Sequence, residues 1–133
     1  MTQLPESVRK LIEEPNFAHL ATLMPDGSPQ VTTLWVDTDG QHVIVNTALG
    51  RQKPRNLERD RRVAINVVDR NNQYRQAMIL GDVVEVTTEG ADAHIDRMAK
   101  KYLGKDVYPN RQPGEQRLLL KISPKRVRTQ GLD

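Results

Sequence analysis

Residues 16–36 read NFAHLATLMPDGSPQVTTLWV, and this stretch decides the fold. Two apolar-rich runs flank Pro-Asp-Gly-Ser, a tetrapeptide of turn-forming residues. This arrangement predicts two antiparallel strands joined by a tight turn. A second turn signal, Thr-Asp-Gly at 38–40, leads into HVIVNT at 42–47. The three segments together predict a three-stranded antiparallel meander.

Further elements are predicted on both sides of this meander. Apolar residues at helical spacing predict a short amphipathic lid helix over 5–13, a short helix around 54–60 and a helix in EGADAHIDRMAKKYLG that stops at Gly104. Strands are expected in RVAINVVD (62–69), in YRQAMILGDVVEVTT (74–88) with a bulge at Gly81, and in RLLLKISPKRVRTQ (117–130) with a break at Pro124.

Six or seven short strands with one crossover helix predict a mainly β fold, a small antiparallel barrel in one domain over residues 1–133. Closure of the barrel would remove exposed strand edges. Hydrophobic residues make up only 37% of the chain, so the core should be modest. Several strands, such as the one containing Val43, Ile44 and Val45, are apolar on both faces. One face should fill the barrel, leaving the other to a partner subunit or a ligand.

Composition narrows the function classes. The absence of cysteine excludes disulfides, thiolate catalysis and iron–sulfur ligation. The sequence contains no run of some 18 apolar residues and no signal-peptide pattern. We therefore expect a cytoplasmic location, with neither a membrane span nor membrane association. The net charge of +3 permits anionic partners, but the position of the cations matters more than their sum.

Cations crowd the expected start of the second helix. Arg51, Lys53 and Arg55 surround Pro54, which suits a first helical turn. The helix dipole is positive at this end and disfavours cations there. Either a bound anion, such as a phosphate, completes the site, or the cations form a solvated helix face with pairs such as Arg55 with Glu58. Gly50 would let the backbone approach the phosphate closely, and Thr47 could add a hydroxyl.

Other chemistries have weaker signals. Single-strand nucleic-acid sites usually combine a basic groove with stacking aromatics, and this chain has only five aromatic residues, so nucleic-acid binding is not expected. The three histidines have no metal-site spacing, and no metal is expected. His19 is interpreted as a packed, hydrogen-bonded residue, and His94 in DAHID as a solvated one. Trp35, on a strand face with Val31 and Thr33, would suit a flat ring lying along a strand edge.

The motif Thr47-x-x-Gly50-Arg51-x-Lys53-x-x-Asn56-Leu57, between LATLMPDGSPQVTTLWVD and RVAINVVD, resembles the split β-barrel flavin and deazaflavin family related to pyridoxamine phosphate oxidase. More narrowly, it resembles the PPOX-class enzymes that use coenzyme F420. The segments EGADAHID, KKYLG and YPNRQPGEQR extend the resemblance over nearly the whole chain. The order and spacing of these pieces together are specific.

This resemblance implies a homodimer of FMN-binding-protein-like split barrels with two cofactor sites at the subunit interface. Thr47, Arg51, Lys53 and Asn56 would hold the cofactor phosphate next to Gly50. Residues from Val31 through Thr33 to Trp35 would line the ring. The looser assignment is Arg55, which would reach the oligoglutamate tail of the deazaflavin.

The phosphate motif alone does not choose between F420 and flavin mononucleotide (FMN). Pyridoxamine phosphate oxidases usually carry an arginine and a lysine on the strand matching QVTTLWV and an arginine-rich C-terminal motif, and this chain lacks both. The resemblance thus implies an F420-dependent oxidoreductase acting on a small organic substrate. The alternatives are an FMN-binding oxidoreductase and a non-catalytic F420 carrier. The sequence identifies neither the substrate nor a catalytic residue or proton donor.

Overall fold

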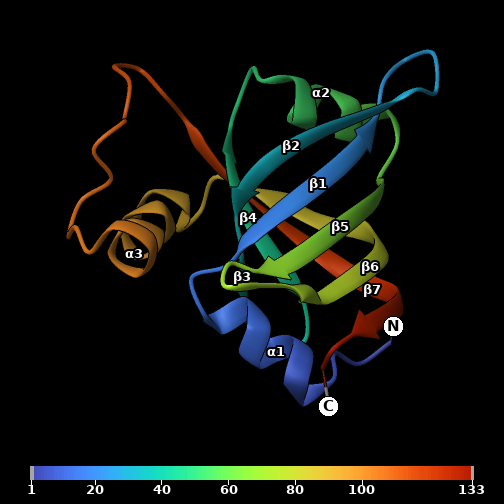
Figure 1. Ribbon diagram of the computed structural model, residues 1–133. Helices are drawn as coiled ribbons and strands as arrows, with labels where there is room; N and C mark the ends of the chain where they lie inside the picture. The colour runs from blue at the N-terminus through green and yellow to red at the C-terminus, as the bar shows by residue number, and fades with distance from the viewer. Residues whose placement is uncertain (1, 133) are drawn as a thin grey trace.

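The computed structural model describes residues 2–132, which form one curled antiparallel sheet with three helices around it (Figure 1). The helices are α1 (Glu6–Glu13), α2 (Gln52–Arg59) and α3 (Ala91–Leu103). The strands are β1 (Phe17–Leu23), β2 (Pro29–Trp35), β3 (Asp37–Thr38), β4 (Val43–Ala48), β5 (Arg62–Asp69), β6 (Asn72–Thr87) and β7 (Arg117–Gln130). The mainly β architecture matches the predicted split-barrel class.

The predicted hairpin is formed, but the predicted meander is wrong. Strands β1 and β2 pair along their whole length, with Phe17 opposite Trp35 and Leu23 opposite Pro29. The sheet order is β2-β1-β5-β6-β7-β4-β3, so β4 lies at the far end of the sheet from β2. The chain crosses from one edge to the other at Val36, and only the two-residue strand β3 pairs back onto β4. Within residues 2–132 the barrel is therefore split between β2 and β4 rather than closed.

The core fills the concave side of the sheet, and α1 closes one end of it (Figure 1). Val8, Leu11 and Ile12 of α1 are fully buried among core strand residues such as Leu20 and Leu120. The amphipathic pattern of the sequence predicted this lid helix. Helix α2 lies toward the other end of the barrel and adds Leu57 to the same core.

The bulge expected at Gly81 is present, and it explains why β7 does not break at Pro124. The pairing of β6 with β7 shifts next to Gly81, which lies opposite Pro124. A Cβ atom at Gly81 would lie 2.4 Å from the carbonyl oxygen of Ser123, so only glycine fits there. Because the shift places Pro124 beside a bulge, the missing proline N–H does not interrupt the strand.

Helix α3 covers the second face of β4. It begins and ends at glycines in the left-handed conformation, and Gly104 is the predicted stop. Ala91, His94, Ile95, Met98 and Ala99 of this helix are buried. The two-faced apolar character of β4 is therefore explained by packing of the core on one side and of α3 on the other.

Candidate functional site

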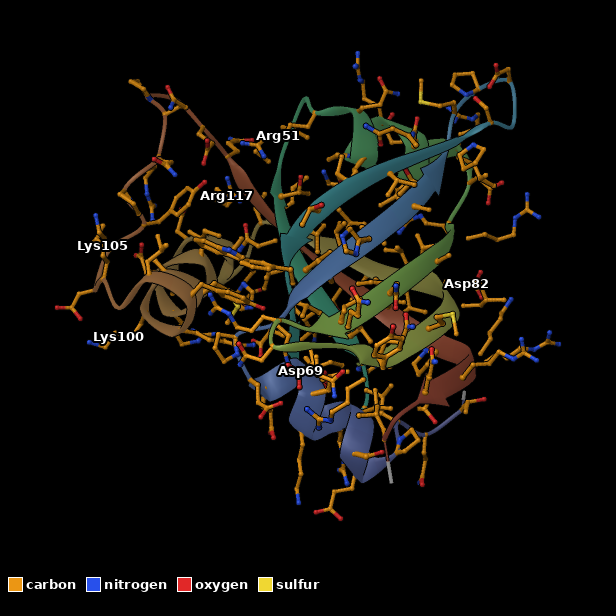
Figure 2. All side chains as sticks on the ribbon, in the orientation of Figure 1. Arg51, Asp69, Asp82, Lys100, Lys105 and Arg117 are labelled. Carbon is orange, nitrogen blue, oxygen red and sulfur yellow. The ribbon has the colours of Figure 1, made fainter. Side chains whose placement is uncertain are left out.

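A cleft lies at the split of the barrel, where β2, β4 and α3 meet. It has a volume of about 200 Å³. Leu34, Ile95 and Met98 give it apolar walls, while the other lining residues are polar or aromatic: Thr33, Trp35, Asn46, Arg51, Tyr108, Asn110 and Arg117. Figure 2 shows Arg51 and Arg117 on the side of the barrel between α2 and α3. Convergent polar groups beside an apolar and aromatic wall are typical of small-molecule sites.

The start of α2 at one end of this cleft has unsatisfied hydrogen-bond donors. Arg51 is the N-cap residue and makes no capping side-chain bond, and the first turn contains no acidic residue. In the described chain, the backbone amides of Gln52 and Lys53 have no acceptor, and Pro54 has no N–H to offer. Gly50, with φ of 93°, forms the turn before the helix. Two free amides and the positive end of the dipole point to an anion site.

Two of the cations at this helix start, Lys53 and Arg55, have no carboxylate within ion-pair distance among residues 2–132. Lys53 is half-buried and donates a 3.0 Å hydrogen bond to Thr32 Oγ1. Burial, and secondarily the charge of Arg51, lowers the pKa of Lys53. Arg55 bonds Gln52 rather than Glu58, so the solvated helix face with an Arg55–Glu58 pair is not formed. A half-buried Lys53 without a carboxylate partner in the described residues, next to free amides, favours an anionic ligand.

Thr47 and Asn56 differ in how free their side chains are. Thr47 is buried, and its Oγ1 has no hydrogen-bond partner in the described chain. Asn56 is fully buried, and its amide donates 2.9 Å to Thr22 Oγ1 and accepts 2.7 Å from Gln52 Nε2. The Asn56 amide therefore fixes α2 against β1. The Thr47 hydroxyl is left without a partner among the described residues.

The ring-lining residues expected on β2 separate into two groups. Thr33 and Trp35 line the cleft. Val31 lies further along the same strand face, with 60% of its surface exposed, and does not line the cleft.

A buried polar network supports the α3 wall of the cleft. Asn46 Nδ2 donates to the carbonyl of Ala91 (2.9 Å) and to His94 Nδ1 (3.0 Å). His94 Nε2 lies 3.0 Å from Asp37 Oδ2. Because the Ala91 carbonyl oxygen can only accept, the Asn46 side chain must turn its NH₂ group toward it. The same NH₂ group then donates to His94 Nδ1, so His94 must carry its proton on Nε2. His94 is thus a buried structural residue, and its interpretation as solvated is wrong.

The same network holds Arg117 and Glu115. Arg117 Nε donates 2.8 Å to Asn46 Oδ1, and its Nη1 donates 2.8 Å to Glu115 Oε1. Both side chains of this ion pair are nearly inaccessible, 3% and 6% exposed. Burial alone would raise the pKa of Glu115, but the Arg117 hydrogen bond and the charges of Arg117 and Arg51 keep it below its usual value. Glu115 Oε2 also lies 3.9 Å from Arg51 Nη2.

Aromatic side chains form the wall where β2 meets α3. Trp35 stacks on Tyr102 at 5.0 Å between ring centroids, and Tyr108 meets Trp35 edge-on at 6.0 Å. The Tyr102 hydroxyl donates to the Asn16 carbonyl and accepts from the Val36 amide. Burial raises the pKa of Tyr102 to about 12. Tyr102 is therefore a packing residue rather than a proton donor.

A larger and more open hollow of about 580 Å³ lies on the outer face of the sheet. It is lined by Phe17, His19, Thr33, Val68 and residues 69–74 of the β5–β6 hairpin. His19 is exposed here and makes no hydrogen bond within the described residues, so its interpretation as a packed, hydrogen-bonded residue is wrong. Thr33 lines both hollows, so they are neighbours: the outer hollow extends over β1, and the cleft extends toward β4 and α3.

Sequence reasoning missed the contribution of α3 and of the loop after it. Asn46, Tyr108, Asn110 and Arg117 all line the cleft. Two signals were available: Asn46 interrupts the apolar run VIVNT, and Arg117 begins the apolar run RLLL. A polar residue inside a buried strand requires a partner, but the sequence does not say which one.

The comparisons with known proteins agree with this fold. Residues 4–131 match the family described as pyridoxamine 5'-phosphate oxidase (PNPOx_N), and the chain belongs to this family. An F420 reductase is similar over 94% of this chain and 98% of its own, at 30% identity and a TM-score of 0.81. The conserved hypothetical protein Rv2991 from Mycobacterium tuberculosis (23% identity, TM-score 0.73, 98% and 89% covered) shares the fold. HupZ from Group A Streptococcus shares the fold as well, at 23% identity and a TM-score of 0.66, over 97% of this chain and 96% of its own. Among curated proteins no significant match is found.

Together, these comparisons support a flavin- or deazaflavin-type oxidoreductase. No helix within residues 2–132 combines the length and apolar character needed to cross a bilayer.

Proposed function

We propose that this protein is an F420-dependent reductase that binds the cofactor phosphate at the start of α2. The observation that carries this proposal is the set of unsatisfied groups there. Among residues 2–132, Lys53 has no carboxylate partner, two backbone amides have no acceptor, and the buried Thr47 hydroxyl has no partner. Buried or clustered polar groups of native proteins rarely remain unpaired. A phosphate would supply the missing acceptor and the missing negative charge.

The residues present fit such a cofactor. Arg51 and Lys53 would bind the phosphate, Thr47 would add a hydroxyl, and Thr33 and Trp35 would contact the ring. Asn56 would hold α2 in place through Thr22 rather than donate its already engaged amide. Arg55, exposed beyond the helix start, would reach the carboxylates of the tail.

The F420 branch is favoured over FMN by the strand β2 and by the F420 reductase that is 30% identical. Strand β2 reads PQVTTLW and offers no cation, unlike the corresponding strand expected for a pyridoxamine phosphate oxidase. The substrate would be a small organic electron acceptor.

When bound, the reduced deazaflavin supplies a hydride from C5 of its ring. The protein's part is to bind, orient and exclude water. Arg51 and Lys53 anchor one end of the cofactor, and the wall of Trp35 and Tyr108 shields the cleft from solvent. The Tyr102 hydroxyl is engaged with backbone groups, so solvent water is the proposed proton source.

The proposed assembly is a homodimer that uses the outer face of the sheet. In cross-strand register, Val31, Ala21, Ala64 and Leu80 form one row. Val31, Met78 and Leu80 are all exposed, between 42% and 60%. Such aligned apolar residues on a sheet face favour a protein partner. Light scattering should show a dimer, and Leu80→Glu should yield monomers.

A second candidate is a non-catalytic F420 carrier, and the packing of Tyr108 against Trp35 favours it. The loop that carries Tyr108 would block access of an acceptor to the ring. In that case the reduced cofactor would bind tightly and stay reduced with every acceptor offered. Turnover with any acceptor would reject the carrier.

The test of the proposed function is a fluorescence titration of the cofactor-free protein with F420 and, separately, with FMN at physiological salt. Micromolar or tighter binding with a preference for F420 is expected. A preference for FMN would move the protein to the flavin branch. No binding to either would reject the cofactor site.

A further inference from the structure

The loop after α3 places a buried carboxylate beside the positive site at the start of α2. Glu115 lies between two arginines, with Arg117 at 2.8 Å and Arg51 at 3.9 Å. Its side chain is nearly inaccessible. A negative charge this close to a cluster of cations is an unexpected feature for a site that binds an anion.

Glu115 is fixed, whereas Arg51 is free to move. Arg117 cannot follow a ligand, because its Nε bonds Asn46 and its guanidinium lies 5.2 Å from the centre of the Tyr108 ring. The ion pair between Glu115 and this anchored guanidinium is nearly inaccessible, so Glu115 is held in place as well. The Arg51 side chain is half exposed and makes no hydrogen bond within residues 2–132. Arg51 can therefore offer its donors to a ligand while the carboxylate stays in place.

The Glu115 carboxylate repels any anion that Arg51 binds. An anion that accepts a hydrogen bond from Arg51 Nη2 lies within about 8 Å of Glu115. At this distance in a partly buried site, repulsion is appreciable and grows in proportion to the ligand's charge. Arg51 and Lys53 together offset one negative charge of the ligand more easily than two, because Glu115 already neutralises part of their field.

This proportionality separates two kinds of phosphate. A phosphomonoester such as the end of FMN carries about −1.5 to −2 charge at pH 7. The phosphate of the deazaflavin joins the polyol to the tail, so it is a diester with a single charge. We propose that Glu115 is a specificity-determining residue that makes this site select singly charged phosphodiesters over doubly charged phosphomonoesters. The proposal rests on the proposed function for the location of the phosphate.

The first test uses the unaltered protein and two flavins that differ only in phosphate charge, FMN and riboflavin 5'-(methyl phosphate). Dissociation constants are measured by flavin fluorescence at pH 7.5. A site built only of cations would bind FMN much more tightly. The expected result is that the methyl ester binds at least as tightly as FMN, and tighter binding of FMN than of its methyl ester would overturn the proposal.

The second test removes the charge with Glu115→Gln, which keeps an oxygen for Arg117. Affinity should rise about threefold for the methyl ester and for F420, and about tenfold for FMN, because the effect on the logarithm of affinity doubles with the charge. The matched control is Glu58→Gln on the exposed side of α2, which should change all three affinities by less than twofold. An unchanged ratio of FMN to ester in Glu115→Gln would overturn the proposal.

The remaining outcomes separate this proposal from the proposed function. If both flavins follow the expected pattern and F420 does not bind, the charge selection stands and the F420 function fails. If FMN binds the Glu115→Gln variant but not the unaltered protein, the selection stands as well. If FMN binds neither protein while F420 binds both equally, the selection fails and the F420 function stands. If none of the three compounds binds, both fail. Should Glu115→Gln not fold, the comparison of the two flavins in the unaltered protein decides.

Discussion

The start of α2 and the inner side of α3 are both rich in polar groups, and they differ in how far those groups are satisfied. At α3, Asp37, His94, Asn46 and Arg117 are joined in one chain of hydrogen bonds. At α2, Lys53 and the first backbone amides have no anionic partner in the part of the chain that the structure describes. The first arrangement stabilises the fold, and the second is what a ligand site looks like before the ligand arrives.

This contrast makes different predictions for substitutions in the two regions. A change in the satisfied network leaves several buried groups unpaired, so the free energy of unfolding should fall. A change at the helix start removes a group that the fold does not use, so ligand binding should weaken while the fold survives. The predictions below test that division.

The largest effect is expected for Asn46→Ala. This change removes the partner of Arg117 Nε, of His94 Nδ1 and of the Ala91 carbonyl. The free energy of unfolding should fall by about 3 kcal/mol, because buried groups are left unsatisfied. Urea denaturation of the variant and the unaltered protein measures this change in the free energy of unfolding. The control is Asn110→Ala in the exposed loop, which should cost less than about 0.5 kcal/mol. Equal stability of the two variants would show that the network is not stabilising.

The next effect is expected for Lys53→Ala, which should weaken F420 binding about tenfold through loss of one charge-assisted bond. The fold should be unaffected or slightly more stable, because burial and Arg51 already lower the pKa of Lys53. Fluorescence titration and thermal unfolding measure the two quantities. Arg61→Ala, an exposed cation beyond the end of α2, is the control and should bind normally. Unchanged affinity in Lys53→Ala would remove its phosphate role.

The sequence predicted local features of the fold well and long-range pairing poorly. The β1–β2 hairpin, the bulge at Gly81 and the stop at Gly104 follow from turn and backbone chemistry within a few residues. The position of β4 at the other edge of the sheet does not, because Val43, Ile44 and Val45 are equally compatible with several neighbours. Which strand they pair with depends on β7, some 75 residues further on.

The same division holds for the candidate site. The cations at 51–55 could be singled out because they conflict with a local rule, the preference of helix starts for anions. Asn46, Glu115 and Arg117 break no local rule, and their meaning comes from contacts across about 70 residues of chain. His94 was misinterpreted for this reason, since only the packing of α3 on β4 buries it.

A smaller effect on stability is expected from pH, and it comes from Lys101 and Tyr102 at the C-terminal end of α3. Burial lowers the pKa of Lys101 to about 8, although Asp37 and Glu13 oppose this shift. Between pH 8 and about 10 the unfolded state then binds more protons than the folded state, so stability should rise with pH. Burial raises the pKa of Tyr102 to about 12. Above pH 10 the folded state keeps that proton longer, so stability should fall.

Thermal unfolding from pH 7 to 11 should therefore show a maximum near pH 10. Lys101→Met should abolish the rise, and Tyr102→Phe should reduce the fall. A rise that persists in Lys101→Met would assign it to other groups.

The smallest effect concerns salt, and it divides the helix start itself into two parts. Lys53 is half-buried and bonded to Thr32, whereas Arg55 is exposed. Exposed charge pairs are screened by salt much more than partly buried ones. If the tail of F420 lies along Arg55, raising the salt concentration should weaken F420 binding about twofold more than FMN binding, because only F420 has carboxylates there. Arg55→Gln should remove that difference while leaving FMN binding unchanged. An equal salt response of both cofactors in the unaltered protein would mean that the tail hangs free of α2, and that the phosphate alone accounts for the cations at the helix start.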